Sequence, residues 1–225
     1  MSVIPVPADS TAQRHGREVE RVFELMLAEI IAGTLAPGMK LNEAELARRM
    51  DANRGPIREA IRRLEGRGLV VCKPNAGARV IRHSPKEVLD TYAMRESVEG
   101  FAARLAAKNM SEAEIDGLRE TTRLSRAGDL DQASFHLQIV RGSGNYAIRK
   151  LLNDEFYQLL KLWRTNFPWL RHADARSWFD HDRITEAIAY RDGDSAELLM
   201  RNHLKRLGEV ILQNLREAGG PEAQP

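Results

Sequence analysis

The stretch ANRGPIREAIRRLEGRGLV, residues 52 to 70, places an arginine at every fourth position, at Arg54, Arg58 and Arg62. From Pro56, a residue suited to a first helical turn, apolar residues recur at i, i+3, i+4 and i+7: Ile57, Ala60, Ile61 and Leu64. On a helical wheel Arg58 and Arg62 point away from that stripe, and Arg54 precedes the first turn. The stretch predicts a helix that buries one side and presents guanidinium groups on the other.

The flanking segments predict a winged helix-turn-helix over residues 18 to 83. An amphipathic segment at 18 to 31 and a short helix that starts at Asn42 precede the stretch, and the turn DANRG (51 to 55) separates the short helix from it. LVVCK and ARVIR, joined by PNAG, follow it and read as two short strands in a hairpin. Three helices and a hairpin give that fold.

Beyond residue 83 the pattern is helical throughout, so we predict a mainly α protein whose second domain is an all-α bundle. Ser84 and Pro85 open a long amphipathic segment, and further helices are expected at about 112 to 126, 130 to 142, 146 to 166, 177 to 191 and 194 to 217. This domain spans 84 to 217. Residues 1 to 17 are expected to be a disordered leader and 218 to 225 a flexible tail.

Charge is distributed unevenly along the chain. The net charge is +2, but residues 47 to 82 carry 10 Lys and Arg against 3 Asp and Glu, which favours a polyanionic partner for the first domain. No run has the apolar length of a membrane span, so no membrane association is expected. The lone Cys72 allows no disulfide within the chain, which fits a cytoplasmic location.

Two interpretations of the arginine row compete. It is either a solvated face on which Glu59 pairs with Arg62 or Arg63, or the recognition helix of the helix-turn-helix, whose N-terminal residues approach the bases of double-stranded DNA. The predicted fold favours the second. We expect Arg54 and Arg58 near bases and phosphates, and Arg62 or Arg49 on the backbone. In the wing, Asn75 and Gly77 allow close approach to DNA.

The stretch IIAGTLAPGMKLNEAELARRM, followed by ANRGPIREAIRRLEGRGLVV and NAGARV, resembles the DNA-binding domain of GntR-type bacterial transcription regulators. The resemblance implies a homodimer that binds a pseudo-palindromic operator. The chain departs from the family pattern at Asn53, where Ser is usual, and at Gly55, where Thr is usual. The loss of a hydroxyl at Gly55 removes a phosphate contact, so the operator sequence is expected to differ.

The remainder resembles the all-helical FCD type of effector domain of the FadR-like branch, on the stretches LDTYAMRESVE, AARLAA, FDHDRITEAI, RDGD and RNHL. This implies that a small metabolite, commonly a carboxylate, controls operator affinity. The family pattern places Arg95 near the effector cavity, and Arg164 is a second candidate cation. The alternative for Arg95 is an i, i+4 pair with Glu99 on the helix surface.

Many such domains bind a divalent metal through one Asp and three His, and the matching positions here are Gln132, His136, His181 and His203. Zinc, nickel or a similar ion fits three imidazoles, and neutral Gln132 in the usual Asp position is expected to weaken binding. The alternative is that these histidines are ordinary surface or hydrogen-bonded core residues.

A metal-dependent enzyme, a metal sensor and a nonspecific DNA-coating protein are the alternatives to an effector-controlled regulator. An enzyme is considered because three histidines around an ion could activate water. The modest net charge and the large second domain argue against nonspecific coating of DNA. No H-E-x-x-H, nucleophile elbow, Walker loop or dinucleotide fingerprint occurs in the sequence. An enzyme would also leave the arginine row unexplained. We therefore expect a transcription regulator without enzymatic activity.

Overall fold

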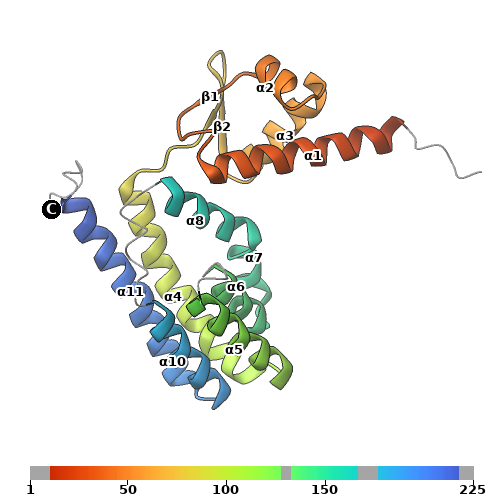
Figure 1. The fold of residues 1–225 in the computed structure, drawn as a ribbon. Coiled ribbons are helices and arrows are strands. Elements are labelled where there is room, and N and C mark those ends of the chain that lie inside the picture. Colours follow the sequence, from red (N-terminus) through yellow and green to blue (C-terminus); the bar gives the residue numbers. More distant parts are fainter. Residues whose placement is uncertain (1–10, 128–132, 167–176, 218–225) are drawn as a thin grey trace, which may run out of the picture. The chain divides into compact units, whose positions relative to one another are not determined.

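The computed structural model describes residues 11–127, 133–166 and 177–217, and the chain divides into two compact units, one ending at Arg82 and one beginning at His83 (Figure 1). The described residues are mainly α-helical with one small sheet, which confirms the predicted fold class. No helix in the described ranges combines the length and the apolar character that crossing a membrane requires.

Between residues 11 and 82, the first unit has three helices and a three-stranded antiparallel sheet of order β1-β3-β2. Its elements are α1 (Thr11–Ala32), β1 (Lys40–Leu41), α2 (Glu43–Arg49), α3 (Arg54–Gly66), β2 (Val70–Lys73) and β3 (Gly77–Val80). The apolar stripes of α1 and α3 face each other, and the side chains of Phe23, Met26, Ile57 and Leu64 are fully buried between them. Burial of these stripes fixes which face of α3 remains exposed.

Three details of this unit differ from the prediction. The sheet has a third strand, because Lys40 pairs with Arg79 and Leu41 with Ala78; two residues are too few to show an alternating pattern. Helix α3 begins at Arg54 and not at Pro56, since a proline within the first turn removes an N–H that has no helical partner anyway. Helix α1 begins at Thr11, so residues 11 to 17 are helical and not part of a disordered leader.

The second unit contains only helices among its described residues. They are α4 (Pro85–Asn109), α5 (Glu112–Ala127), α6 (Ala133–Gly142), α7 (Tyr146–Leu151), α8 (Asp154–Asn166), α10 (Ser177–Ala189) and α11 (Gly193–Glu217). Ser84 begins α4 with a capping box, in which its hydroxyl accepts from the N–H of Glu87 and its own N–H donates to the Glu87 carboxylate.

The predicted helix at 146 to 166 is two helices. Leu152 leaves the helical conformation and is fully buried, and the Asn153 side chain accepts the N–H of Phe156 to start α8. The apolar periodicity continues across this break, which is why the sequence pattern did not reveal it.

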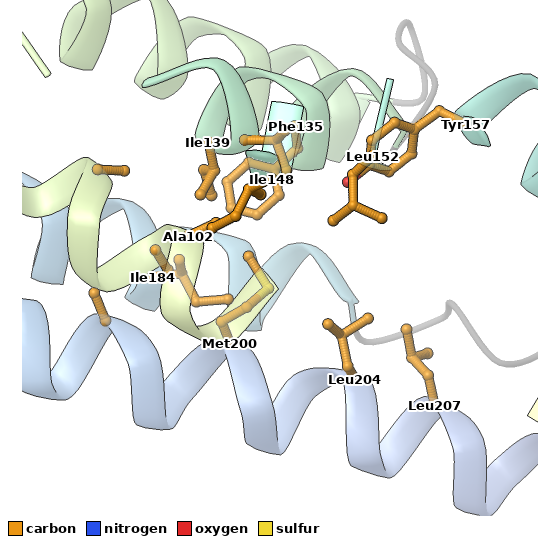
Figure 2. Close-up of a cluster of buried hydrophobic side chains, with 14 of the residues drawn as sticks. Ala102, Phe135, Ile139, Ile148, Leu152, Tyr157, Ile184, Met200, Leu204 and Leu207 are labelled. Carbon is orange, nitrogen blue, oxygen red and sulfur yellow. The ribbon is translucent and has the colours of Figure 1, made fainter. Parts of the chain in front are cut away.

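The core of the second unit lies where α6, α10 and α11 pack against α4, with α11 running along α4 (Figure 1). Figure 2 shows Phe135 and Ile139 from α6, Ile184 from α10, and Met200 and Leu204 from α11 converging there. The same three helices carry the candidate metal-binding histidines, so these histidines are placed on the inner faces of a packed bundle.

Candidate nucleic-acid interface and buried histidine site

The arginine row lies on the exposed face of α3. Arg54, Arg58 and Arg62 are all exposed, while the apolar stripe on the other side of the helix is buried. The guanidinium of Arg58 donates to the carboxylate of Glu43 on α2, with Nη2 to Oε2 at 2.9 Å and Nε to Oε1 at 3.3 Å. Arg62 makes only a looser pair with Glu59, at 3.8 Å. The face therefore contains one acidic residue, Glu43, that no sequence pattern singled out.

The other predicted DNA-contacting residues lie around this face or in the wing. Arg49 on α2 pairs with Glu29 of α1. Gly55 is exposed in the first turn of α3. In the wing, Asn75 and Gly77 both have positive φ, 60° and 75°, which forms the tight turn between β2 and β3. The turn is exposed, so the wing tip is open to a partner.

The three candidate histidines come together in the core of the second unit. His136 on α6, His181 on α10 and His203 on α11 are buried, and one ligand atom from each lies within 4.8 Å of the other two. Their ring centroids are 4.9 to 5.3 Å apart, and Phe135 stacks on His181 at 3.9 Å. Positions far apart in the sequence thus form one cluster.

Two carboxylates orient two of these rings through contacts at Nδ1. His136 Nδ1 lies 2.6 Å from Glu99 Oε2, and His203 Nδ1 lies 3.0 Å from Asp180 Oδ2. When Nδ1 donates to a carboxylate, the lone pair of the neutral ring is on Nε2. Both rings are therefore set to present Nε2 as a ligand atom. Neither carboxylate was predicted from the sequence in this role.

Arg95 belongs to the same network. It is 3% exposed, its Nε donates to Glu99 Oε1 at 2.6 Å, and its guanidinium lies over the ring of Tyr92 at 4.9 Å. The i, i+4 pair of Arg95 with Glu99, which was the alternative to a role in effector binding, thus exists. It is buried, however, and does not lie on the helix surface. The side chain of Arg164 and residue Gln132 lie outside the described residues.

Charges in the network are fixed by burial and by the partners. Burial opposes ionisation of Glu99, but the Arg95 guanidinium and His136 outweigh it and hold the pKa of Glu99 at about 2. Burial lowers the pKa of His203 to about 4, although its hydrogen bond to Asp180 acts in the opposite direction. His203 is therefore neutral at neutral pH, the state that binds metals.

The residues present fit a divalent metal ion. His203 Nε2 is buried and has no hydrogen-bond partner among the described residues, as expected of a ligand atom that faces a cation. Three imidazoles are a donor set suited to zinc, nickel or a similar ion. Among the described residues no carboxylate joins the three rings as a ligand. The charge of a bound cation would therefore be left for an anionic ligand to balance.

Together, a winged helix-turn-helix followed by an all-helical bundle is the architecture of a DNA-binding transcription regulator. Residues 18–80 match the model of bacterial regulatory proteins of the gntR family, and residues 90–206 match the FCD domain. The chain belongs to the GntR family and carries an FCD domain.

Relatives and solved structures agree with this assignment. The chain is 30% identical to the HTH-type transcriptional repressor GlaR of Escherichia coli over 82% of this chain and 91% of that protein. It is 27% identical to a probable D-xylose utilization operon transcriptional repressor of Paenarthrobacter nicotinovorans, over 87% and 90% of the two chains. A putative GntR regulator from Rhodococcus shares the fold, with a TM-score of 0.71 at 19% identity over 88% and 98%.

We predict that Glu99→Gln strongly destabilises the helical unit at neutral pH. The substitution leaves Arg95 buried without a counter-charge, which costs about 3–5 kcal/mol of the free energy of unfolding. The pKa of Glu99 is about 2 when folded against an ordinary 4.5, so its contribution is complete above 4.5 and is lost as the pH falls toward 2. Urea unfolding followed by circular dichroism should show the difference from wild type narrowing over that range.

Glu120→Gln is the matched control, because Glu120 is an exposed carboxylate paired with Arg123 on α5. It should unfold almost as the wild type does. Equal stability of Glu99→Gln and wild type at neutral pH would contradict the assigned network.

Proposed function

We propose that this GntR-family protein is an effector-controlled regulator whose helical unit binds a small carboxylate together with a divalent metal ion. The observation that carries this proposal is the cluster of three buried imidazoles, two of them oriented by carboxylates. A structural core rarely contains three adjacent imidazoles with a buried ring nitrogen left over, because unsatisfied polar groups destabilise the fold. A ligand that binds this site is the simplest reason to retain them.

The metal would be bound by His136, His181 and His203, with Gln132 as a weak fourth ligand. A bound cation supplies an electrophilic site for a carboxylate oxygen. Glu99 and Asp180 position two of the rings, and the guanidinium of Arg95, whose charge Glu99 already compensates, would offer its remaining N–H groups to the carboxylate of an acidic effector. The loss of the usual Asp at Gln132 removes one negative charge, which weakens metal binding but strengthens attraction of an anion.

The DNA face would be α3 with the wing of the first unit. Arg54 and Arg58 lie in the first turns of α3, the part of a recognition helix that reaches the bases, and Arg62 and Arg49 would contact the backbone. Gly55 lets the backbone approach a phosphate closely, and Asn75 and Gly77 bring the wing tip to the duplex. Two copies of the chain would bind a pseudo-palindromic operator in the cytoplasm.

The effector can control DNA binding only if it binds one arrangement of the dimer better than another. The residues around the capping box at Ser84 join the two units and are the expected hinge. Whether the effector releases or promotes DNA binding depends on which arrangement it favours, and both outcomes use the same site.

The DNA face is tested with Arg58→Ala. An operator is first selected from a random duplex library with the wild-type protein, and affinity is then measured by gel-shift titration. Loss of a bidentate contact to a base should weaken binding by about 1–3 kcal/mol, roughly 5- to 150-fold. Arg123→Ala, on the exposed surface of α5, should leave affinity unchanged. Wild-type affinity in Arg58→Ala would exclude Arg58 from the interface.

The metal site is tested by calorimetric titration of chelator-treated protein with Zn²⁺ and with Ni²⁺. The wild type should bind one ion per chain, and His203→Ala should weaken binding by about 100-fold or more, because it removes one of three imidazole ligands. His15→Ala, an exposed histidine of α1, should bind as the wild type does. Absence of binding in the wild type, or equal binding in His203→Ala, would overturn the site.

A further inference from the structure

Glu43 is an acidic residue of α2 that lies next to the arginine row of α3. It is the first residue of α2, where the side chain of Asn42 caps the helix by accepting the N–H groups of Ala44 and Glu45. Its carboxylate accepts both Nε and Nη2 of Arg58 on α3. The cap fixes the start of α2, and the fork of Arg58 fits the two carboxylate oxygens, so the pair has a defined geometry.

The carboxylate of Glu43 is negatively charged at the neutral pH at which the protein would bind DNA. The hydrogen bond from Arg58 is the main cause that lowers the pKa of Glu43, and the positive charges of Arg54 and Arg62 lower it further. All three arginines of the row therefore lie within electrostatic range of one carboxylate. A negative charge in this position offsets part of the attraction that the arginines exert on DNA phosphates.

Stability does not explain the pair. The Arg58 side chain is 57% exposed and that of Glu43 is 36% exposed, and ion pairs at such exposure contribute little to folding. The pair instead affects which hydrogen-bond acceptors Arg58 is able to bind. To offer the same fork of Nε and Nη2 to DNA, Arg58 must exchange the carboxylate for another bidentate acceptor.

We propose that Glu43 is a specificity-determining residue, which makes Arg58 available only to a duplex that offers an acceptor as good as the carboxylate. This rests on α3 being the DNA face. Guanine O6 and N7 are neutral acceptors that match the fork of Arg58, whereas a phosphate bound by Arg58 would bring its negative charge close to the carboxylate of Glu43 and be repelled by it. Glu43 thus weakens binding to all DNA but weakens nonspecific binding more.

The test compares Glu43→Gln with Glu45→Gln by fluorescence anisotropy, on a random-sequence duplex of about 24 base pairs. Both variants lose one negative charge from the first turn of α2, but Glu43 pairs with Arg58 whereas Glu45 is exposed, so Glu45→Gln is the control for the lost charge. Glu43→Gln should bind this duplex about 3- to 10-fold more tightly than Glu45→Gln does. The dependence of its affinity on salt, over about 50 to 200 mM, should steepen by about 0.9, which corresponds to one more phosphate contact.

A second pair of variants separates a role through Arg58 from general repulsion. When Arg58→Ala is added to both variants, Glu43→Gln and Glu45→Gln should bind the random duplex with equal affinity. On an operator selected with the wild type, Glu43→Gln should gain less than on the random duplex, so the ratio of the two affinities falls.

The possible failures are distinct. If the wild type binds DNA and Glu43→Gln matches Glu45→Gln on the random duplex, the role of Glu43 is wrong and the DNA face stands. If the gain persists without Arg58, Glu43 acts only as a repelling charge and the exchange is wrong. If the wild type binds no duplex even at about 50 mM salt, the DNA face and this proposal both fail.

Discussion

The ion pair of Arg95 with Glu99 is the interaction on which the buried site depends. Each charge alone would be prohibitively costly in the bundle core, and each is stable there only because the other is present. Glu99 uses its second oxygen to bind His136, so the pair connects α4 to α6 and orients a candidate ligand. Asp180 does the same for His203 from α10 to α11. These contacts hold polar side chains in fixed orientations within the packed core.

The same chemistry, a carboxylate that holds a cationic or imidazole side chain, occurs in both units with different consequences. In the core, Glu99 is almost inaccessible to water, so its bonds are strong and fix one geometry. On the exposed face of α3, the pair of Glu43 with Arg58 is solvated and weak, so a better acceptor can replace Glu43. Burial decides whether such a contact acts as a fixed support or as an exchangeable partner.

The sequence predicted the fold well, because the stripe of Ile57, Ala60, Ile61 and Leu64 and similar stripes in the helical domain record which faces are buried. It missed β1 and the break at Asn153, which are too local to change that periodicity. The three histidines were named from a resemblance and lie together in the structure. Glu99 was not predicted as the partner of His136, because its i, i+4 pair with Arg95 has the same spacing whether it is solvated or buried. Asp180 was not predicted as the partner of His203, because the two residues are 23 positions apart and on different helices. Only the packing of the helices brings either carboxylate to its histidine.

The most direct test of this account is the protonation of the histidine rings in the metal-free protein, measured by nitrogen-15 NMR of histidine-labelled samples at neutral pH. We predict that His203 is neutral with the proton on Nδ1 and Nε2 unprotonated, because burial lowers its pKa to about 4 and Asp180 accepts the Nδ1 proton. In His136 we predict that Nδ1 carries a proton, because Glu99 accepts it. Assignment of the two rings would use His136→Gln and His203→Gln. A proton on Nε2 of His203, or an unprotonated Nδ1 in either ring, would contradict the claim that these carboxylates prepare the histidines to bind a cation.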